Sequence, residues 1–130
     1  TPPDGRQQPC QRRQASARLQ PVMQPAELEA AQQEVLQVHA SDSLLDYLQA
    51  LIAASRSGRW FIDGLSPRAG IAVLRVARAR AMMAGRDYVA PDDVQAILPQ
   101  AIAHRLVPMP GAGRGPIEQV RAMVEAVPIP

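Results

Sequence analysis

Apolar residues recur along the middle of the chain with the spacing of helices rather than the alternation of strands. The clearest stripe lies in residues 42–57, where apolar residues fall at positions i, i+1, i+4, i+7 and i+8: Leu44, Leu45, Leu48, Leu51 and Ile52. Ser41 and Asp42 favour a helix start in front of this stripe, and Gly58 favours its end. Residues 42–57 are therefore predicted to form a core-facing helix.

Two shorter helices are predicted nearer the ends of the chain. Residues 25–36 begin with a proline and carry acids in the first turn, and their apolar residues share one side: Leu28, Ala31, Val35 and Leu36. Residues 116–127 are expected to turn four apolar residues inward: Ile117, Val120, Met123 and Val124. A short extended link is expected at residues 38–40 and a loop at residues 58–65.

The best-marked helix begins at Pro67, a residue suited to the first helical position, with Ser66 in front of it as the N-cap. Gly85 is a natural C-terminal cap for this helix. Its apolar residues cover more than one face: Ile71, Val73, Leu74, Val76, Ala77, Ala81 and Met82. This distribution predicts a central position in the fold.

The next helix opens at Pro91, with two aspartates in a first turn that favours negative charge. Ala90 occupies the cap position without a side-chain acceptor, at a cost of about 0.5–2 kcal/mol. Pro99 would break this helix from within, so we expect one helix over residues 91–98 and a restart over residues 99–106. Together the segments predict an all-α bundle of four to five helices.

Composition agrees with one helical domain of 130 residues. Aromatic residues are scarce, which favours helices over a sandwich or barrel and predicts an aliphatic core. Residues 1–20 lack periodicity and are interpreted as a flexible linker or a remnant of a preceding core, and residues 21–130 as the domain itself. Cys10 is the only cysteine, so a disulfide framework is excluded and a zinc site is implausible. No apolar run is long enough for a membrane span, and the composition of the first residues is not that of a secretory leader, so neither a membrane span nor a secretory precursor is expected.

Charge is distributed unevenly, although the formal net charge is only +2. Residues 56–86 hold seven arginines and one acid, whereas residues 21–55 hold five acids and no base. A basic block in a folded domain is usually a solvated face, but it can also bind phosphate. One possible function is therefore a helical adaptor or nucleic-acid-binding domain that uses residues 56–86. The acidic flanks and the lack of a helix suited to reading bases argue against it.

Arg68 is the one residue with a chemical signal, because the chain has no typical catalytic arrangement and no glycine-rich phosphate loop. A cation in the first turn opposes the helix dipole by about 0.3–1 kcal/mol. The free N–H groups of a helix start suit an anion, and the guanidinium could bridge them to a phosphate. Otherwise Arg68 is a solvent-exposed arginine or pairs with Asp63. Spacing alone favours these two interpretations.

Seven short motifs follow one another along the chain: Asp46-Tyr47, Ser55-Arg56, Gly64 through Ala69, Ala77-Arg78-Ala79, Gly85 through Val89, Pro91 through Val94, and His104-Arg105. In this order they resemble the C-terminal part of MoxR-type AAA+ ATPases, over residues 19–130. Related lids occur in magnesium-chelatase ATPase subunits. The departures are modest: Ser55 stands where threonine is usual, Leu65 replaces alanine, and Ala90 replaces serine or threonine.

The resemblance implies the helical lid of a cytoplasmic ATPase, not catalytic by itself. Arg68 matches the family's sensor 2 arginine, which reads the γ-phosphate, and Pro67 and Ala69 lie beside it in the same motif. Arg56 and Arg86 are weaker nucleotide-binding candidates, for which structural salt bridges are favoured. ATP and Mg²⁺ are expected to bind to the parent protein and not to this fragment alone, since the phosphate loop, the Mg²⁺-binding acids and the arginine finger belong to the N-terminal core.

The resemblance also implies partners. These are the N-terminal AAA+ core of the same protein, further copies in a hexameric ring with chaperone-like remodelling activity, and a von Willebrand A-domain protein. Neither nucleic acid nor a membrane is expected. Whether Arg68 acts on its own subunit or on a neighbour stays open, and so does a degenerate lid that serves only ring assembly.

Overall fold

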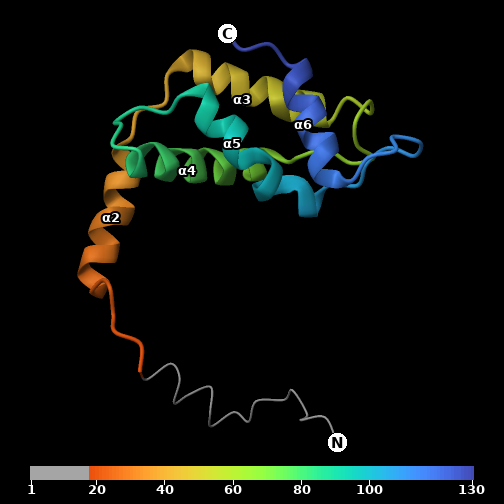
Figure 1. Cartoon of the computed structure of the whole chain (residues 1–130). Helices are drawn as coiled ribbons and strands as arrows, with labels where there is room; N and C mark the ends of the chain where they lie inside the picture. The colour runs from red at the N-terminus through yellow and green to blue at the C-terminus, as the bar shows by residue number, and fades with distance from the viewer. Residues whose placement is uncertain (1–17) are drawn as a thin grey trace, which may run out of the picture. The chain divides into compact units, whose positions relative to one another are not determined.

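The computed structural model describes residues 18–130, and the chain divides into two compact units, Thr1–Ala31 and Gln32–Pro130 (Figure 1). The linker or core remnant predicted for residues 1–20 therefore lies almost wholly outside the described residues. Within residues 18–130 the regular elements are five α-helices and one short 3-10 helix, without a strand. The predicted all-α class is thus confirmed. No helix in that part of the chain is both long and apolar enough to cross a membrane.

The first helix, α2, spans Pro25–Gln37, close to the predicted bounds. None of its residues is buried within the described chain. Leu28 and Leu36 on its apolar side are 51% and 46% exposed. The periodicity of apolar residues therefore located this helix correctly. The described residues, however, do not cover its apolar side.

The other helices pack around one apolar core within residues 32–130. Their bounds are α3 Asp42–Ser55, α4 Pro67–Met83, α5 Pro91–Ile102 and α6 Pro116–Ala126, with the 3-10 helix η1 at Ala103–Arg105. Helix α5 contacts both α3 and α4, which also contact each other, and α6 packs on α3, α5 and η1 (Figure 1). Side chains from all four helices and the loop before α4 fill the core: Leu44, Leu48, Leu51, Phe61, Val73, Ala77, Val94, Leu98, Ile102, Val120 and Met123.

Helix α4 packs closely on its inner side, where an added Cβ at Gly70 would collide with the Cδ1 of Ile52 in α3. Ile71 and Val76 of the same helix are exposed, although Ile71 borders a hollow between α3 and α4. Two of the apolar residues from which a central position was predicted for this helix are therefore not covered. Ile117, predicted to point inward from the first turn of α6, is also exposed.

Helix α5 runs through Pro99 without a break, so the predicted stop at residue 98 and restart at residue 99 are wrong. Proline lacks an N–H and removes one helical hydrogen bond. Packing offsets that loss, because Leu98, Pro99 and Ile102 are all buried. The α-helical geometry ends only after Ile102, where η1 begins.

The loop between α3 and α4, residues 56–66, is anchored to the core. Phe61 is fully buried, so the core is less purely aliphatic than predicted. Its neighbours pair with a distant segment: the Ile62 N–H donates to the Val107 carbonyl at 2.9 Å, and the Met109 N–H donates to the Trp60 carbonyl at 3.0 Å. This pairing fixes the path of the chain as it approaches α4.

Candidate functional site

Arg68 lies in the first turn of α4. Ser66 caps the helix as predicted, because its Oγ accepts a hydrogen bond from the Ala69 N–H at 3.2 Å. The Arg68 side chain is exposed and makes no ion pair or side-chain hydrogen bond within residues 18–130. The ion pair with Asp63, which the sequence allowed, is not formed there.

The backbone at this helix start offers fewer free N–H groups to an anion than the sequence suggested. Pro67 has no N–H to donate, and the N–H of buried Ala69 is already bonded to Ser66. Free N–H groups are what makes a helix start attractive to an anion. The anion-binding capacity of this turn therefore rests on the Arg68 guanidinium.

Two contacts hold the loop before α4 against the end of α3. The Ser55 Oγ donates to the Ile52 carbonyl at 2.6 Å and accepts from the Leu65 N–H at 3.0 Å. Gly64 lies so close to Arg56 that an added Cβ would stand 2.6 Å from the Arg56 Cα. Two motifs that are separate in the sequence thus form one structural unit.

Two open hollows flank the start of α4, and both are lined by Arg56 and Pro67. One is apolar, has a volume of about 540 Å³ and continues along α3 through Gln49, Ile52 and Ala53. The other has a volume of about 410 Å³ and is completed by residues 62–66. Arg56 is exposed and forms no ion pair with any described residue, so the structural salt bridge predicted for it is not found.

A second group of arginines, near the other end of α4, is fully paired. The buried Asp93 carboxylate accepts hydrogen bonds from Arg86 at 2.7 and 2.8 Å and from Arg80 at 2.6 Å. It also accepts the Ala90 N–H at 2.8 Å. Hydrogen bonds from Arg86, supported by those from Ala90 and Arg80, outweigh the effect of burial and lower the pKa of Asp93 to about 2.

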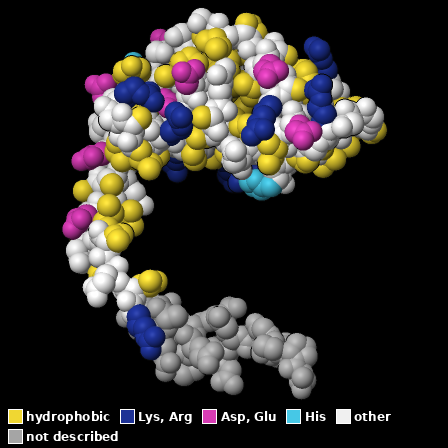
Figure 2. Space-filling model, viewed as in Figure 1, with side chains coloured by type: hydrophobic (Ala, Val, Ile, Leu, Met, Phe, Trp, Pro, Cys, Tyr) yellow, Lys and Arg dark blue, Asp and Glu magenta, His cyan; other side chains and the backbone are white. Residues whose placement is uncertain are grey.

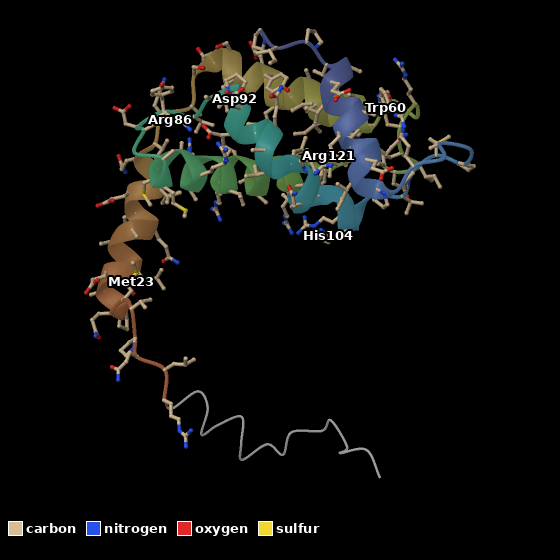
Figure 3. All side chains as sticks on the ribbon, viewed as in Figure 1. Met23, Trp60, Arg86, Asp92, His104 and Arg121 are labelled. Atoms are coloured by element: carbon tan, nitrogen blue, oxygen red, sulfur yellow. The ribbon has the colours of Figure 1, made fainter. Side chains whose placement is uncertain are left out.

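The salt bridge predicted for Arg86 is therefore confirmed, with Asp93 as the acid. Figure 3 shows Arg86 beside the turn that joins α4 to α5. The same hydrogen bonds raise the pKa of Arg86 above its ordinary value. The participation of Arg80 was not anticipated. Only the contact between Asp93 and the Ala90 N–H could have been inferred from the sequence, because an acid in the first turn can reach back to the helix start.

Within residues 18–130, no metal site is found beside either group of arginines. Among the described residues, no three His, Cys, Asp or Glu side chains come together as possible metal ligands. A Mg²⁺ ion held by several protein carboxylates would therefore need residues from outside this part of the chain.

Residues 61–127 match the AAA lid domain family. The YeaC protein of Bacillus subtilis (strain 168) is 35% identical over 115 residues, which cover 86% of this chain and 36% of YeaC. Protein MoxR of Methylorubrum extorquens is 41% identical over 71 residues, 52% of this chain and 21% of that protein. Chaperone MoxR1 of Mycobacterium tuberculosis is 36% identical over 74 residues, 50% of this chain and 20% of that protein.

A solved structure resembles the fold as well. The crystal structure of a proposed ATPase from Cytophaga hutchinsonii superimposes with a TM-score of 0.68 and 28% identity, over 75% of this chain and 33% of that one. The chain thus spans about a third of the length of that ATPase and of YeaC, and about a fifth of the two MoxR proteins. The family match includes the segment that carries Arg68.

Proposed function

The chain belongs to the AAA lid domain family, of the type found in MoxR proteins, and we propose that Arg68 is its sensor 2 arginine. In this role Arg68 contacts the γ-phosphate of ATP bound by a AAA+ core. The core is the N-terminal part of the same protein. The lid thereby contributes to ATP binding and hydrolysis.

The observation that carries this proposal is Arg68 itself, exposed and without an ion pair to any described residue, on an otherwise well-fixed helix start. The guanidinium is free of carboxylate partners within residues 18–130, so it loses no ion pair there when it meets a phosphate. Ser66 caps the turn, and the buried Leu65 anchors the chain in front of it. An arginine on a rigid support can form charge-assisted hydrogen bonds with a phosphate in one orientation of the lid.

Coupling to nucleotide state follows from that geometry. If Arg68 reaches the γ-phosphate in one lid orientation only, ATP stabilises that orientation, and hydrolysis removes the contact. The lid then moves relative to the AAA+ core as one packed unit, because the four main helices of the lid share one hydrophobic core.

ATP and Mg²⁺ are bound chiefly by the core in this proposal. A single arginine and a helix start with few free N–H groups do not replace a phosphate loop, so this chain alone is expected to bind ATP weakly or not at all. The hexameric ring, the chaperone-like activity, the von Willebrand A-domain partner and the cytoplasmic location stay predictions of the family resemblance.

The test is Arg68→Ala in the protein that contains this lid together with its core. ATP turnover is expected to fall by at least about tenfold, since loss of one preorganised donor to a reacting group costs about a hundredfold or more in established cases. ATP affinity is measured alongside by titration with a fluorescent analogue. Turnover equal to that of the unmodified protein would overturn the sensor assignment.

Arg75→Ala is the matched control. Arg75 lies two turns further along α4 and is also exposed, without an ion pair in the described residues. Arg75→Ala changes the charge and the helix propensity as Arg68→Ala does, but it does so in the middle of the helix instead of at its start. An equal loss of turnover in both variants would point to general charge rather than to a sensor.

The adaptor or nucleic-acid-binding alternative gains no support from the structure. Two of the seven arginines in residues 56–86 are bound to Asp93. On the face drawn in Figure 2, basic side chains are interspersed with acidic ones rather than gathered in one patch. We therefore propose no nucleic-acid function.

A further inference from the structure

A buried hydroxyl at the end of α3 reaches the loop that leads to Arg68. The Ser55 side chain is completely buried, so its Oγ cannot touch a nucleotide itself. One of its hydrogen bonds, to the Ile52 carbonyl at 2.6 Å, stays within the helix. The other, from the Leu65 N–H at 3.0 Å, spans ten residues and joins α3 to the residue before the N-cap Ser66.

A second contact joins the neighbouring residues of the same two segments, Arg56 and Gly64. A Cβ at Gly64 would stand 2.6 Å from the Cα and 2.7 Å from the backbone nitrogen of Arg56. Real Cβ atoms essentially never approach backbone atoms so closely, and backbone cannot move aside as a flexible side chain can. Glycine at this position therefore lets the loop lie directly on the end of α3.

Both contacts lie within four residues of Arg68, and the chain between them and Arg68 has little freedom. Leu65 is buried, Ser66 is held by its capping bond, and Pro67 has a fixed φ. A shift of the loop at residues 64–65 is therefore transmitted to the first turn of α4.

We propose that Ser55 and Gly64 are positioning residues for Arg68, which hold the start of α4 against the end of α3 so that the guanidinium projects in one direction. This inference rests on the proposed sensor function. It assigns a role to residues that do not contact nucleotide, and it explains why the paired motifs at residues 55–56 and 64–69 occur together.

The experiment is a double-mutant cycle on ATP turnover in the protein that contains the lid and its core. Ser55→Ala is expected to lower kcat by about tenfold with little change in KM for ATP, because a displacement of about 1 Å at a reacting group can cost up to a hundredfold in rate. In the Arg68→Ala background the same change should have almost no further effect. Ser55→Thr keeps the hydroxyl and should restore turnover.

Ser57→Ala is the matched control. Ser57 lies at the same helix end, and its Oγ donates to the Ala54 carbonyl at 2.7 Å, but its hydroxyl does not reach Leu65. This variant should leave kcat unchanged. Gly64→Ala is the second positioning variant and should reproduce the loss seen with Ser55→Ala. Far-UV circular dichroism of each lid confirms that kinetics are compared at a temperature where the helices are folded.

The outcomes separate the two proposals. Normal turnover in Arg68→Ala removes the sensor function and this inference with it. Reduced turnover in Arg68→Ala, together with normal turnover in folded Ser55→Ala and Gly64→Ala, leaves the sensor intact and overturns the positioning role. The positioning role is also overturned if Ser55→Ala lowers kcat equally with and without Arg68, since the effect then does not pass through Arg68.

Discussion

The two ends of α4 carry arginines in opposite situations. Towards its C-terminal end, Arg80 and the nearby Arg86 both bond to the buried carboxylate of Asp93. At its N-terminal end, Arg68 is exposed and has no ion pair among the described residues. The same type of side chain thus joins helices at one end and is available to a ligand at the other.

The difference lies in the partner and not in the arginine. Asp93 comes from the first turn of α5, close to where α4 ends, so a carboxylate is held where two guanidinium groups can reach it. No described acid is held in that way near Arg68; Asp63 lies in the adjacent loop without pairing with it. Counting arginines in residues 56–86 therefore overstates the charge that is free to bind phosphate.

The largest effect is expected from removing the shared acid. Asp93→Asn leaves two guanidinium groups without their carboxylate. The unfolding free energy should fall by about 3 kcal/mol, the lower end of the range for a broken buried ion pair, because both guanidinium groups are partly exposed. Urea unfolding of this chain, followed by far-UV circular dichroism, measures the loss.

Asp92→Asn is the control for that experiment. Asp92 is the neighbouring residue in the same turn, but it is exposed and makes no ion pair with the described residues. Its neutralisation removes only a helix-dipole interaction of about 0.3–1 kcal/mol. Equal losses in the two variants would show that Asp93 acts as an ordinary first-turn acid, and the contrast between the ends of α4 would disappear.

A smaller loss of unfolding free energy is expected when the pH is lowered. The pKa of Asp93 is about 2 in the folded chain, below the ordinary value of 3.8 for this carboxyl group. A carboxyl group whose folded pKa is lowered stabilises the fold above its unfolded pKa, and this stability is lost as pH falls through the folded value. The contribution is about 2–3 kcal/mol, present above about pH 5 and lost between about pH 4 and pH 2.

The measurement is urea unfolding of the unmodified chain and of Asp93→Asn at a series of pH values. The difference in unfolding free energy between the two proteins should shrink across the acid range, because protonated Asp93 resembles the amide. A difference that stays constant as pH falls would mean that Asp93 does not titrate with a lowered pKa.

Much of the fold could be predicted from the sequence, because local signals specify helices. Prolines at first positions, the N-caps Ser41 and Ser66 and the glycine after α4 placed the starts of α2, α3, α4 and α5 and the end of α4 correctly. Predictions failed where tertiary packing decides. Pro99 stays inside α5 because its surroundings are buried, and Phe61 enters the core because its loop pairs with a segment more than forty residues away.

The candidate site was only partly accessible to the same reasoning. The exposed helix start at Arg68 followed from local signals, since capping and first-turn positions are local properties. The partner of Arg86, the pairing of Arg80, the lack of an ion pair between Arg56 and any described residue, and the hydrogen bond from the Leu65 N–H to Ser55 could not be derived. Each depends on residues brought together by the fold. One sequence has no direct signal for such contacts.

The smallest expected effect concerns helix caps at the two places compared. Ser66 and Ala90 both precede a proline and have similar extended backbones, with φ of −80° and −97° and ψ of 161° and 157°. Only Ser66 has an oxygen that can accept a hydrogen bond from the third residue of its helix.

Ala90→Ser adds that acceptor in front of Asp93, whose carboxylate already accepts the Ala90 N–H, and so completes a reciprocal cap. The unfolding free energy should rise by about 0.5–1 kcal/mol, while Ser66→Ala should lower it by a similar amount. Urea unfolding of both variants tests this. If Ala90→Ser adds no stability while Ser66→Ala removes some, the hydrogen bonds of Asp93 already satisfy the start of α5. The C-terminal end of α4, where the arginines bind Asp93, then gains nothing from a cap, whereas its N-terminal end depends on one.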